Sequence, residues 1–223
     1  MTYEKTAQRV ALKLLDDNGY LKILPAAAYE EFTWEELRLF CHFYARYGLP
    51  TTELIEWLKQ IIDGKSAIEI GSGCGDLGRA LDIPMIDNHC QEWPDVRFYY
   101  LSAGQPLIHY GENIERIDAL EAAKKYKPDI IIGQWITHWI DPTRPVPEGG
   151  GNMYGVKEDL LLKECKTYVM IGNRKVHGFK PILKMQHTEV LAPFIKSRAH
   201  QPDENVIYIW NSEKSSELSV ATK

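Results

Sequence analysis

Ile68-Glu69-Ile70-Gly71-Ser72-Gly73-Cys74-Gly75-Asp76-Leu77-Gly78 is the most informative stretch of this sequence. Residues 67–70 have the pattern of a short buried strand, and residues 76–81 have that of a short helix. The glycines between them let the backbone turn tightly and approach a ligand closely, because no Cβ stands in the way. A helix that begins after such a turn directs unpaired N–H groups and a partial positive charge at the ligand. The order strand, glycine turn, helix therefore predicts a nucleotide site at the edge of a parallel sheet.

Two kinds of nucleotide fit these glycines. Residues 73–78 match the dinucleotide fingerprint G-x-G-x-x-G, but that fingerprint places its first glycine directly after the strand, where Gly71 already lies. The longer string Glu69-x-Gly71-x-Gly73-x-Gly75 resembles the first motif of class I S-adenosylmethionine (SAM)-dependent methyltransferases. An acidic residue suits the amino-acid end and the sulfonium of SAM, whereas it would repel a pyrophosphate. The resemblance implies SAM as the cofactor. The alternatives are an NAD(P)-dependent oxidoreductase and a SAM-binding protein without transferase activity.

Composition restricts the possible partners. The chain has 223 residues, a net charge of −5 and a pI near 5.8, which argues against a nonspecific grip on nucleic acid or an anionic membrane. Its cysteines are scattered without a C-x-x-C pair, and no H-x-x-x-H or H-x-E pattern occurs, so we predict no metal. No apolar run approaches the ~20 residues that span a bilayer. Residues 1–5 lack a signal-peptide pattern, and we expect a cytoplasmic protein.

The chain divides into three predicted regions. Residues 1–63 read as a helical N-terminal cap lobe, in which Thr33 and Glu36 have the spacing of a capping box and a further helix begins at Thr51 or Thr52. Residues 64–211 read as a Rossmann-like SAM-binding domain. Residues 212–223 read as a frayed polar tail.

Strand and helix patterns alternate after residue 66. The expected strands are 66–70, 83–87, 106–110, 129–133, 167–171 and 205–210, and the expected helices are 76–81, 94–102, 116–126, 157–165 and 193–199. This alternation predicts an α/β fold with a Rossmann-like, doubly wound, mostly parallel sheet.

Cofactor contacts follow from the resemblance, strand by strand, because ligands bind at the carboxyl ends of strands in open α/β sheets. The glycine loop would contribute Glu69, Gly71, Ser72, Gly73 and Gly75. Asp87 ends the second strand and, with Asn88 as the substitute, would hold the ribose hydroxyls. Glu112 or Asn113, after the third expected strand, would contact the adenine amino group. Gly133 ends the fourth strand beside the cofactor.

The expected chemistry follows the fourth strand, where the sequence reads Gln134-Trp135-Ile136-Thr137-His138-Trp139. At this position, methyltransferases that modify amino groups of nucleic-acid bases have Asn or Asp, two prolines and an aromatic residue. The cytosine-C5 methyltransferases have a Pro-Cys pair. Neither pattern is present, which argues against the standard DNA base methyltransferases. We expect Gln134 to orient the substrate, and Trp135 and Trp139 to stack on it. Since histidine titrates near neutral pH, His138 is the first candidate for a general base, and His177 is the second.

A loop rich in proline and glycine, residues 142–152, lies between the fourth and fifth expected strands. A loop of this length without regular structure is typical of a lid or a binding loop. We expect it to cover the site, with Asn152 and Tyr154 facing the substrate. The acidic composition disfavours nucleic acid as the methyl acceptor, so a small molecule or a protein side chain is predicted.

Overall fold

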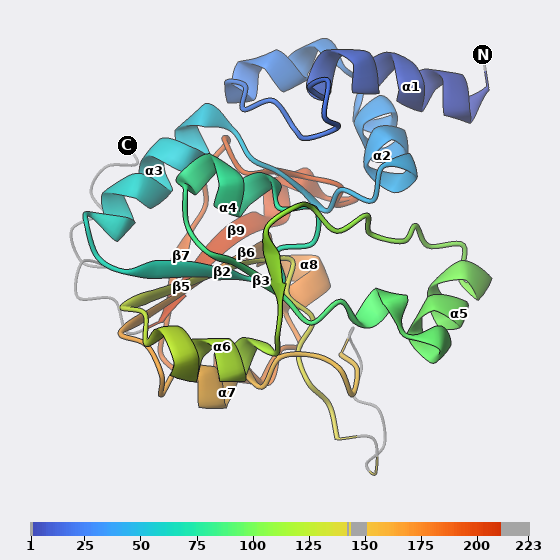
Figure 1. Cartoon of the computed structure of the whole chain (residues 1–223). Coiled ribbons are helices and arrows are strands. Elements are labelled where there is room, and N and C mark those ends of the chain that lie inside the picture. Colours follow the sequence, from blue (N-terminus) through green and yellow to red (C-terminus); the bar gives the residue numbers. More distant parts are fainter. Residues whose placement is uncertain (1, 142, 144–150, 211–223) are drawn as a thin grey trace.

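A mostly parallel sheet lies at the centre of the molecule (Figure 1). The computed structural model describes residues 2–141, 143 and 151–210. Within these residues the sheet has seven strands, in the spatial order β4 (Ile114–Arg116), β3 (Met85–Asp87), β2 (Ala67–Ile70), β5 (Ile130–Gln134), β6 (Thr167–Asn173), β9 (Asn205–Trp210) and β7 (Thr188–Val190). The first five are parallel, and β9 runs antiparallel between β6 and β7. The predicted α/β, Rossmann-like fold class is confirmed.

The central strand β5 shows why these residues form a buried sheet. Ile130, Ile131 and Ile132 are at most 1% exposed, and β5 pairs with β2 on one side and β6 on the other. Successive side chains of a strand point to opposite faces. Ile131 accordingly packs in one apolar cluster, and Ile130 and Ile132 pack in another. A continuous β-branched run is typical of a strand that is covered on both faces.

Helices cover both faces of the sheet (Figure 1). The helices α3 (Thr52–Ile62) and α4 (Asp76–Leu81) share the cluster of Ile130 and Ile132, whereas α6 (Ala119–Tyr126) and α7 (Glu158–Leu161) share the cluster of Ile131. The predicted start of α3 is confirmed, because the Thr51 side chain accepts a hydrogen bond from the Leu54 N–H at 3.2 Å. Although α3 precedes residue 63, it packs on the sheet. The predicted division into regions itself stays a prediction.

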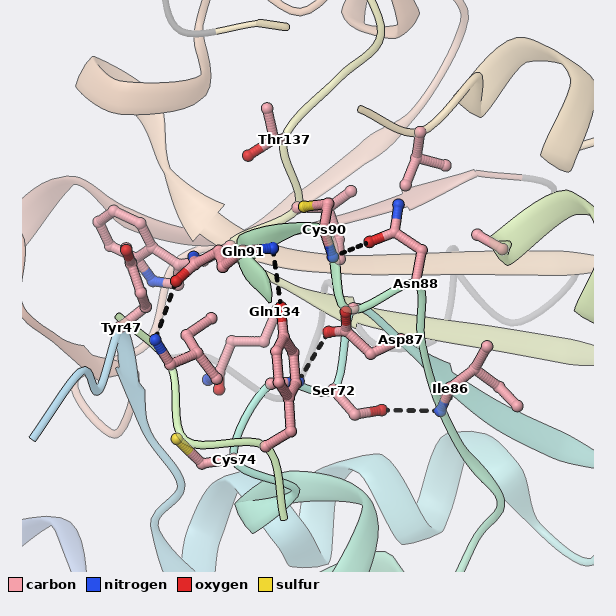
Figure 2. A pocket seen from close by; sticks show the side chains of 18 of the residues that line it. Tyr47, Ser72, Cys74, Ile86, Asp87, Asn88, Cys90, Gln91, Gln134 and Thr137 are labelled. Carbon is pink, nitrogen blue, oxygen red and sulfur yellow. Dashed lines mark hydrogen bonds between the residues drawn. The ribbon is translucent and has the colours of Figure 1, made fainter. Parts of the chain in front are cut away.

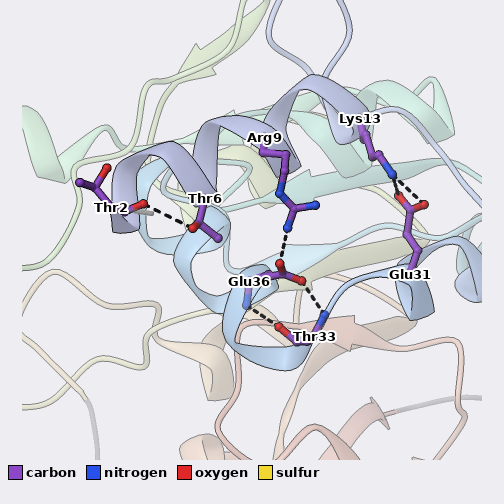
Figure 3. A network of polar contacts seen from close by, with 7 residues as sticks. All are labelled: Thr2, Thr6, Arg9, Lys13, Glu31, Thr33 and Glu36. Carbon is purple, nitrogen blue, oxygen red and sulfur yellow. Dashed lines mark hydrogen bonds and ion pairs between the residues drawn. The ribbon is translucent and has the colours of Figure 1, made fainter.

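A separate apolar cluster holds the N-terminal helices together. It joins α1 (Tyr3–Leu14), the 3₁₀ helix η1 (Ala26–Glu31) and α2 (Trp34–Phe43). The expected capping box is present, since the Thr33 and Glu36 side chains each bond to the other residue's backbone N–H. Figure 3 shows the ion pairs Arg9–Glu36 and Lys13–Glu31, which tie α1 to the segments that follow it. Because these pairs are partly exposed to solvent, each contributes little to the stability of the lobe.

Two expected elements are wrong. Residues 106–110 form no strand, because they cross the glycine loop instead: the Ile108 N–H donates to Gln91 Oε1 at 2.9 Å, and the Gly111 N–H donates to the Gly73 carbonyl at 3.3 Å. The third strand is β4, which begins at Ile114. Residues 193–199 form no helix, and they contain the strand β8 (Lys196–Ser197), which pairs with β1 (Gly48–Leu49).

The remaining elements are short. Helix α5 (Pro94–Ser102) lies where a helix was expected. Helix α7 covers only part of the expected helix 157–165. The other short helices are η2 (Cys90–Glu92), α8 (Arg174–His177), η3 (Pro181–Lys184) and η4 (Pro202–Glu204). Among the residues that the structure describes, no helix combines the length and the apolar character needed to cross a membrane. The predicted tail, 212–223, lies outside the described residues.

Candidate functional site

A cavity of about 170 Å³ opens at the carboxyl ends of β2, β3 and β5. Figure 2 shows side chains that line it, including those of Ser72, Asp87, Asn88 and Gln134. We call it the sheet-edge cavity. The sequence-predicted residues among its lining are Glu69, Gly71, Ser72, Gly73, Asp87, Asn88, Gln134, Trp135, Asn152 and Tyr154. The structure therefore brings most of the predicted cofactor and substrate residues to one place.

The glycine loop has the backbone conformation that its sequence predicts. Gly71, Gly73 and Gly75 have φ values of +59°, +55° and +78°, in the left-handed region that other residues adopt at a cost. A Cβ added to Gly73 would lie 3.5 Å from Ile108, an ordinary van der Waals contact, so the backbone conformation rather than packing calls for glycine here. Gly75 is the exception among the predicted loop residues, because it is buried against Met85 and does not line the cavity.

Glu69 lies beneath the loop. Its side chain is buried and its Oε2 accepts a hydrogen bond from the Gly78 N–H at 2.9 Å. Burial raises the pKa of Glu69 to about 8, against the opposing hydrogen bonds from Ser72 and Gly78. The group is therefore mostly protonated at neutral pH. Its role in this geometry is to hold the first turn of α4 against β2, not to present a negative charge to a ligand.

Asp87 joins the end of β3 to the glycine loop. Its Oδ2 accepts from the Gly73 N–H at 3.0 Å, and its Oδ1 accepts from the His89 N–H at 2.8 Å. Burial raises the pKa of Asp87, although these hydrogen bonds oppose the shift. Asn88 follows, and it accepts from the Cys90 N–H at 3.0 Å. Both side chains lie in the cavity wall as the sequence predicted, and each carboxylate oxygen of Asp87 has a further lone pair for a ligand.

The end of β4 supplies residues that the sequence interpretation missed. Glu112 and Asn113 are exposed, precede β4 and do not line the cavity, because the third strand begins at Ile114. Asp118 and Ala119 line it instead. Asp118 is the N-cap of α6, and its Oδ1 accepts from the Leu120 N–H at 2.8 Å. An Asp directly before an apolar helical pattern is a helix-start signal, and that signal would have placed these residues correctly.

Gln134 and Trp135 enter the cavity from the end of β5. The Gln134 side chain packs against Gly48, since a Cβ added there would lie 2.1 Å from its Nε2. Among the residues that the structure describes, neither Gln134 Nε2 nor Trp135 Nε1 has a hydrogen-bond partner, and both atoms are buried. Trp135 has φ +58°, an uncommon conformation for a bulky residue. Gly133 precedes them in the sheet, where it is buried against Ile136 and Ile70 and does not line the cavity.

His138 and Trp139 lie away from the sheet-edge cavity. They line a second cavity together with Lys157 and Ile182. His138 is 4% exposed, and burial, with Lys180 nearby, lowers its pKa to about 4. Lys157 Nζ lies 4.6 Å from the centre of the Trp139 ring. Ile136 and Thr137 still line the sheet-edge cavity, and the chain passes to the second cavity at His138.

His177 lies outside the sheet-edge cavity and packs against Trp135, a residue that lines it. The Nδ1 of His177 accepts from the Asn173 N–H at 2.9 Å. Burial, with Lys180 nearby, lowers the pKa of His177 to about 3. Its ring meets Trp135 edge-on, with the ring centres 5.1 Å apart. This histidine positions Trp135 and is neutral at physiological pH.

Asn152 and Tyr154 close the cavity on the side of Asn88. The Tyr154 N–H donates to Asn152 Oδ1 at 2.9 Å, and Asn88 Nδ2 donates to the Tyr154 carbonyl at 3.4 Å. The Tyr154 ring lies against Trp93. Most of the expected lid, residues 142 and 144–150, lies outside the described residues.

The N-terminal lobe reaches the same cavity through residues 45–48. Arg46 Nε lies 2.8 Å from Asp76 Oδ2, and both side chains are less than a tenth exposed. Asp76 also accepts from the Leu21 N–H at 2.8 Å. Residues 45–48 carry no local motif, so a sequence pattern gives no signal for this contribution. Within the part of the chain that the structure describes, no three His, Cys, Asp or Glu side chains gather where they could hold a metal ion.

Comparisons with known proteins give matches among solved structures only, and two of these matches are described below. No protein-family model and no curated protein sequence matches the chain. A structure from Staphylococcus aureus, described as "a putative caffeoyl-CoA O-methyltransferase", is 13% identical with a TM-score of 0.38, and the alignment covers 82% of this chain and 95% of that one. Thermoplasma acidophilum 1320 is 16% identical with a TM-score of 0.35, covering 79% of this chain and 94% of that one. The fold assignment therefore rests on strand order and register.

Proposed function

We propose that this chain is a SAM-dependent methyltransferase of class I whose methyl acceptor is a small molecule or a protein side chain. The strand order, with antiparallel β9 between β6 and β7, is consistent with a Rossmann-like methyltransferase sheet. The sheet-edge cavity lies at the carboxyl ends of the strands, where such sheets bind their ligands. SAM, when bound, would supply an electrophilic methyl group on a sulfonium.

The observation that carries the proposal is that a backbone N–H group in the first turn of α4 already has a hydrogen-bond partner. A dinucleotide of the Rossmann type needs free N–H groups there for its pyrophosphate. In this chain the Glu69 carboxyl already accepts from the Gly78 N–H at 2.9 Å, and Asp76 is the first residue of the helix. A pyrophosphate would find this N–H donor already occupied by a carboxyl group. A zwitterionic amino-acid end has no such conflict, which favours SAM over NAD(P).

The residues present fit the parts of SAM. The loop from Gly71 to Gly73, with its left-handed glycines, would hold the amino-acid end. Asp87 has lone pairs for the ribose hydroxyls. The Asp118 carboxylate would accept a hydrogen bond from the adenine amino group. The Ala119 N–H lies at the first position of α6 and has no partner within the helix, so it would donate to a nitrogen of the adenine ring.

The chain's own contribution to the reaction is orientation. His138 and His177 are buried with lowered pKa values and lie outside the cavity lining, so neither is positioned as a general base. Gln134 lies at the end of β5, where its amide would orient the methyl acceptor. Alignment of two reactants alone accelerates a transfer reaction strongly.

Calorimetric titration of the purified chain with SAM and, separately, with NADH tests the proposal. We expect SAM to bind and NADH not to bind. Gly73→Ala should weaken SAM at least tenfold, because Gly73 lines the cavity and its new Cβ would lie against Ile108, another lining residue. Gly64→Ala is the matched control: Gly64 also has a positive φ, +74°, but nothing lies within 4 Å of its Cβ position and it does not line the cavity.

The control separates backbone strain from a lost contact. Both substitutions place a side chain in the left-handed region, at a cost of about 1 kcal/mol each. Only Gly73→Ala should also change SAM affinity. NADH binding without SAM binding, or equal effects of the two substitutions on SAM, would overturn the proposal.

A further inference from the structure

We infer that the sheet-edge cavity selects an uncharged, planar aromatic molecule that carries an oxygen or ring nitrogen with free lone pairs, bound at Gln134 and Trp135. As a statement about the methyl acceptor it rests on the proposed function. As a statement about binding it stands on four features of the cavity wall. These are two unpartnered donors, a fixed indole ring, a tyrosine from the N-terminal lobe and the absence of an available cation among the described lining residues.

Two N–H donors at this end of the cavity lack a partner. Gln134 Nε2 and Trp135 Nε1 are buried, and each has no hydrogen-bond partner among the described residues. A buried donor without a partner costs about 1–3 kcal/mol, so a ligand whose lone pairs reach these two donors when the side chains turn toward it gains from satisfying them. An ammonium group has no lone pairs and would face these donors unfavourably.

The charged side chains that line the cavity disfavour an anionic ligand. Arg46 is the one arginine or lysine among the described lining residues of the cavity, and its guanidinium already pairs with Asp76 at 2.8 Å. Arg198 lies on the Tyr47 ring, 4.4 Å from its centre, and does not line the cavity. A carboxylate or phosphate would lose its hydration here without gaining an ionic partner among the described lining residues. The cavity therefore favours a neutral heteroatom over a charged one.

The aromatic rings fix the shape of the ligand. Trp135 is held edge-on by His177, with ring centres 5.1 Å apart, and tilts against Tyr47 at 6.1 Å. Tyr47 comes from the N-terminal lobe, so a ring that packs here contacts both parts of the chain. Aromatic pairs at such separations stabilise an interaction beyond the area they bury.

Titration with three probes of equal ring size tests the inference: 2-naphthol, naphthalene and 2-naphthoate, each at pH 7 with the full chain. We expect 2-naphthol to bind about tenfold more tightly than the other two, the scale of one satisfied donor. Gln134→Met keeps the length of the side chain and removes its N–H donors, so it should bring 2-naphthol close to naphthalene and leave naphthalene unchanged. Trp135→Phe should weaken 2-naphthol as well, and Trp139→Phe, outside the cavity, should change nothing.

Equal binding of 2-naphthol and naphthalene, tighter binding of 2-naphthoate, or no binding of any probe would overturn the inference. So would full 2-naphthol affinity in both Gln134→Met and Trp135→Phe. SAM titration of the same preparations separates the two proposals. Probe selectivity without SAM binding leaves the aromatic subsite standing and refutes the methyltransferase, whereas SAM binding without probe selectivity does the reverse.

Discussion

Burial changes the chemistry of Glu69. The glutamate of the glycine motif was expected to act through its charge, but its pKa of about 8 leaves it mostly neutral at pH 7. In the unfolded chain a solvated glutamate has its ordinary pKa of 4.5. As the pH rises from 4.5 to 8, the unfolded chain loses a proton that the folded chain keeps. Folding stability attributable to this group therefore falls across that window, by up to about 1.4 kcal/mol per pH unit.

Glu69→Gln tests this pH dependence. Glutamine retains an oxygen for the Gly78 N–H and does not titrate, so the variant should be increasingly more stable than the wild type as the pH rises from 5 to 8. Urea denaturation of both proteins at pH 5 and pH 8 measures the difference. A difference that is the same at both pH values would contradict the raised pKa.

The sequence predicted the position of residues in the fold where local signals act. The glycine turn and Asp87 are defined by neighbours within a few positions, and the structure places them together in the cavity wall. His138 was selected because it follows β5 closely, but it lines the second cavity, whereas Thr137 just before it lines the sheet-edge cavity. A hydrophobic pattern does not show which side of an irregular segment each side chain takes, so this placement was beyond prediction.

At the scale of elements, a buried ion pair couples the N-terminal lobe to the glycine loop. Arg46 Nη2 donates to the Gly19 carbonyl at 2.7 Å, and its Nε pairs with Asp76, whose other oxygen binds the Leu21 N–H. The pair thus joins α4 to the turn that follows α1. Removing one partner of a buried pair leaves an uncompensated charge, which typically costs about 3–5 kcal/mol.

We predict that Arg46→Met and Asp76→Asn each lower the free energy of unfolding by about 3 kcal/mol. The double variant should lose clearly less than the sum of the two, because no buried charge is left alone. Denaturant titration of the three variants and the wild type completes the cycle. Additive losses would show that the two side chains do not depend on each other.

The misplaced third strand explains why the candidates for the adenine contact were missed. Residues 106–110 are β-prone, yet tertiary hydrogen bonds to Gln91 and Gly73 hold them across the loop. The real strand, Ile114-Glu115-Arg116, is a short edge strand with polar side chains, which carries little hydrophobic signal. Because the third strand was expected too early in the sequence, the adenine contact was expected at Glu112 and Asn113, and not at Asp118, where we now propose it.

At the scale of the whole molecule, the cavity is built from both parts of the chain. The alternation of strands and helices was sufficient to predict the α/β class, because each element buries a continuous apolar face. The convergence of residues 45–48 with the ends of β2, β3 and β5 depends on contacts between distant segments, and no local pattern records it.

A ligand that bridges both parts should stabilise the whole fold. SAM at about 100 times its dissociation constant should add about 2.7 kcal/mol to the free energy of unfolding. For a chain of this size the corresponding rise in Tm is about 5–10 °C. Scanning fluorimetry with and without SAM measures it, and NADH at the same concentration serves as the control. A rise with NADH alone would favour the dinucleotide interpretation.

The most direct test of the account is a crystal structure of the chain with S-adenosylhomocysteine, the demethylated and unreactive form of the cofactor. We expect the amino-acid end at the loop from Gly71 to Gly73, the ribose at Asp87 and the adenine at Asp118 and Ala119. A ligand found in the second cavity beside His138, or with its adenine at the glycine loop, would contradict the proposed cofactor site.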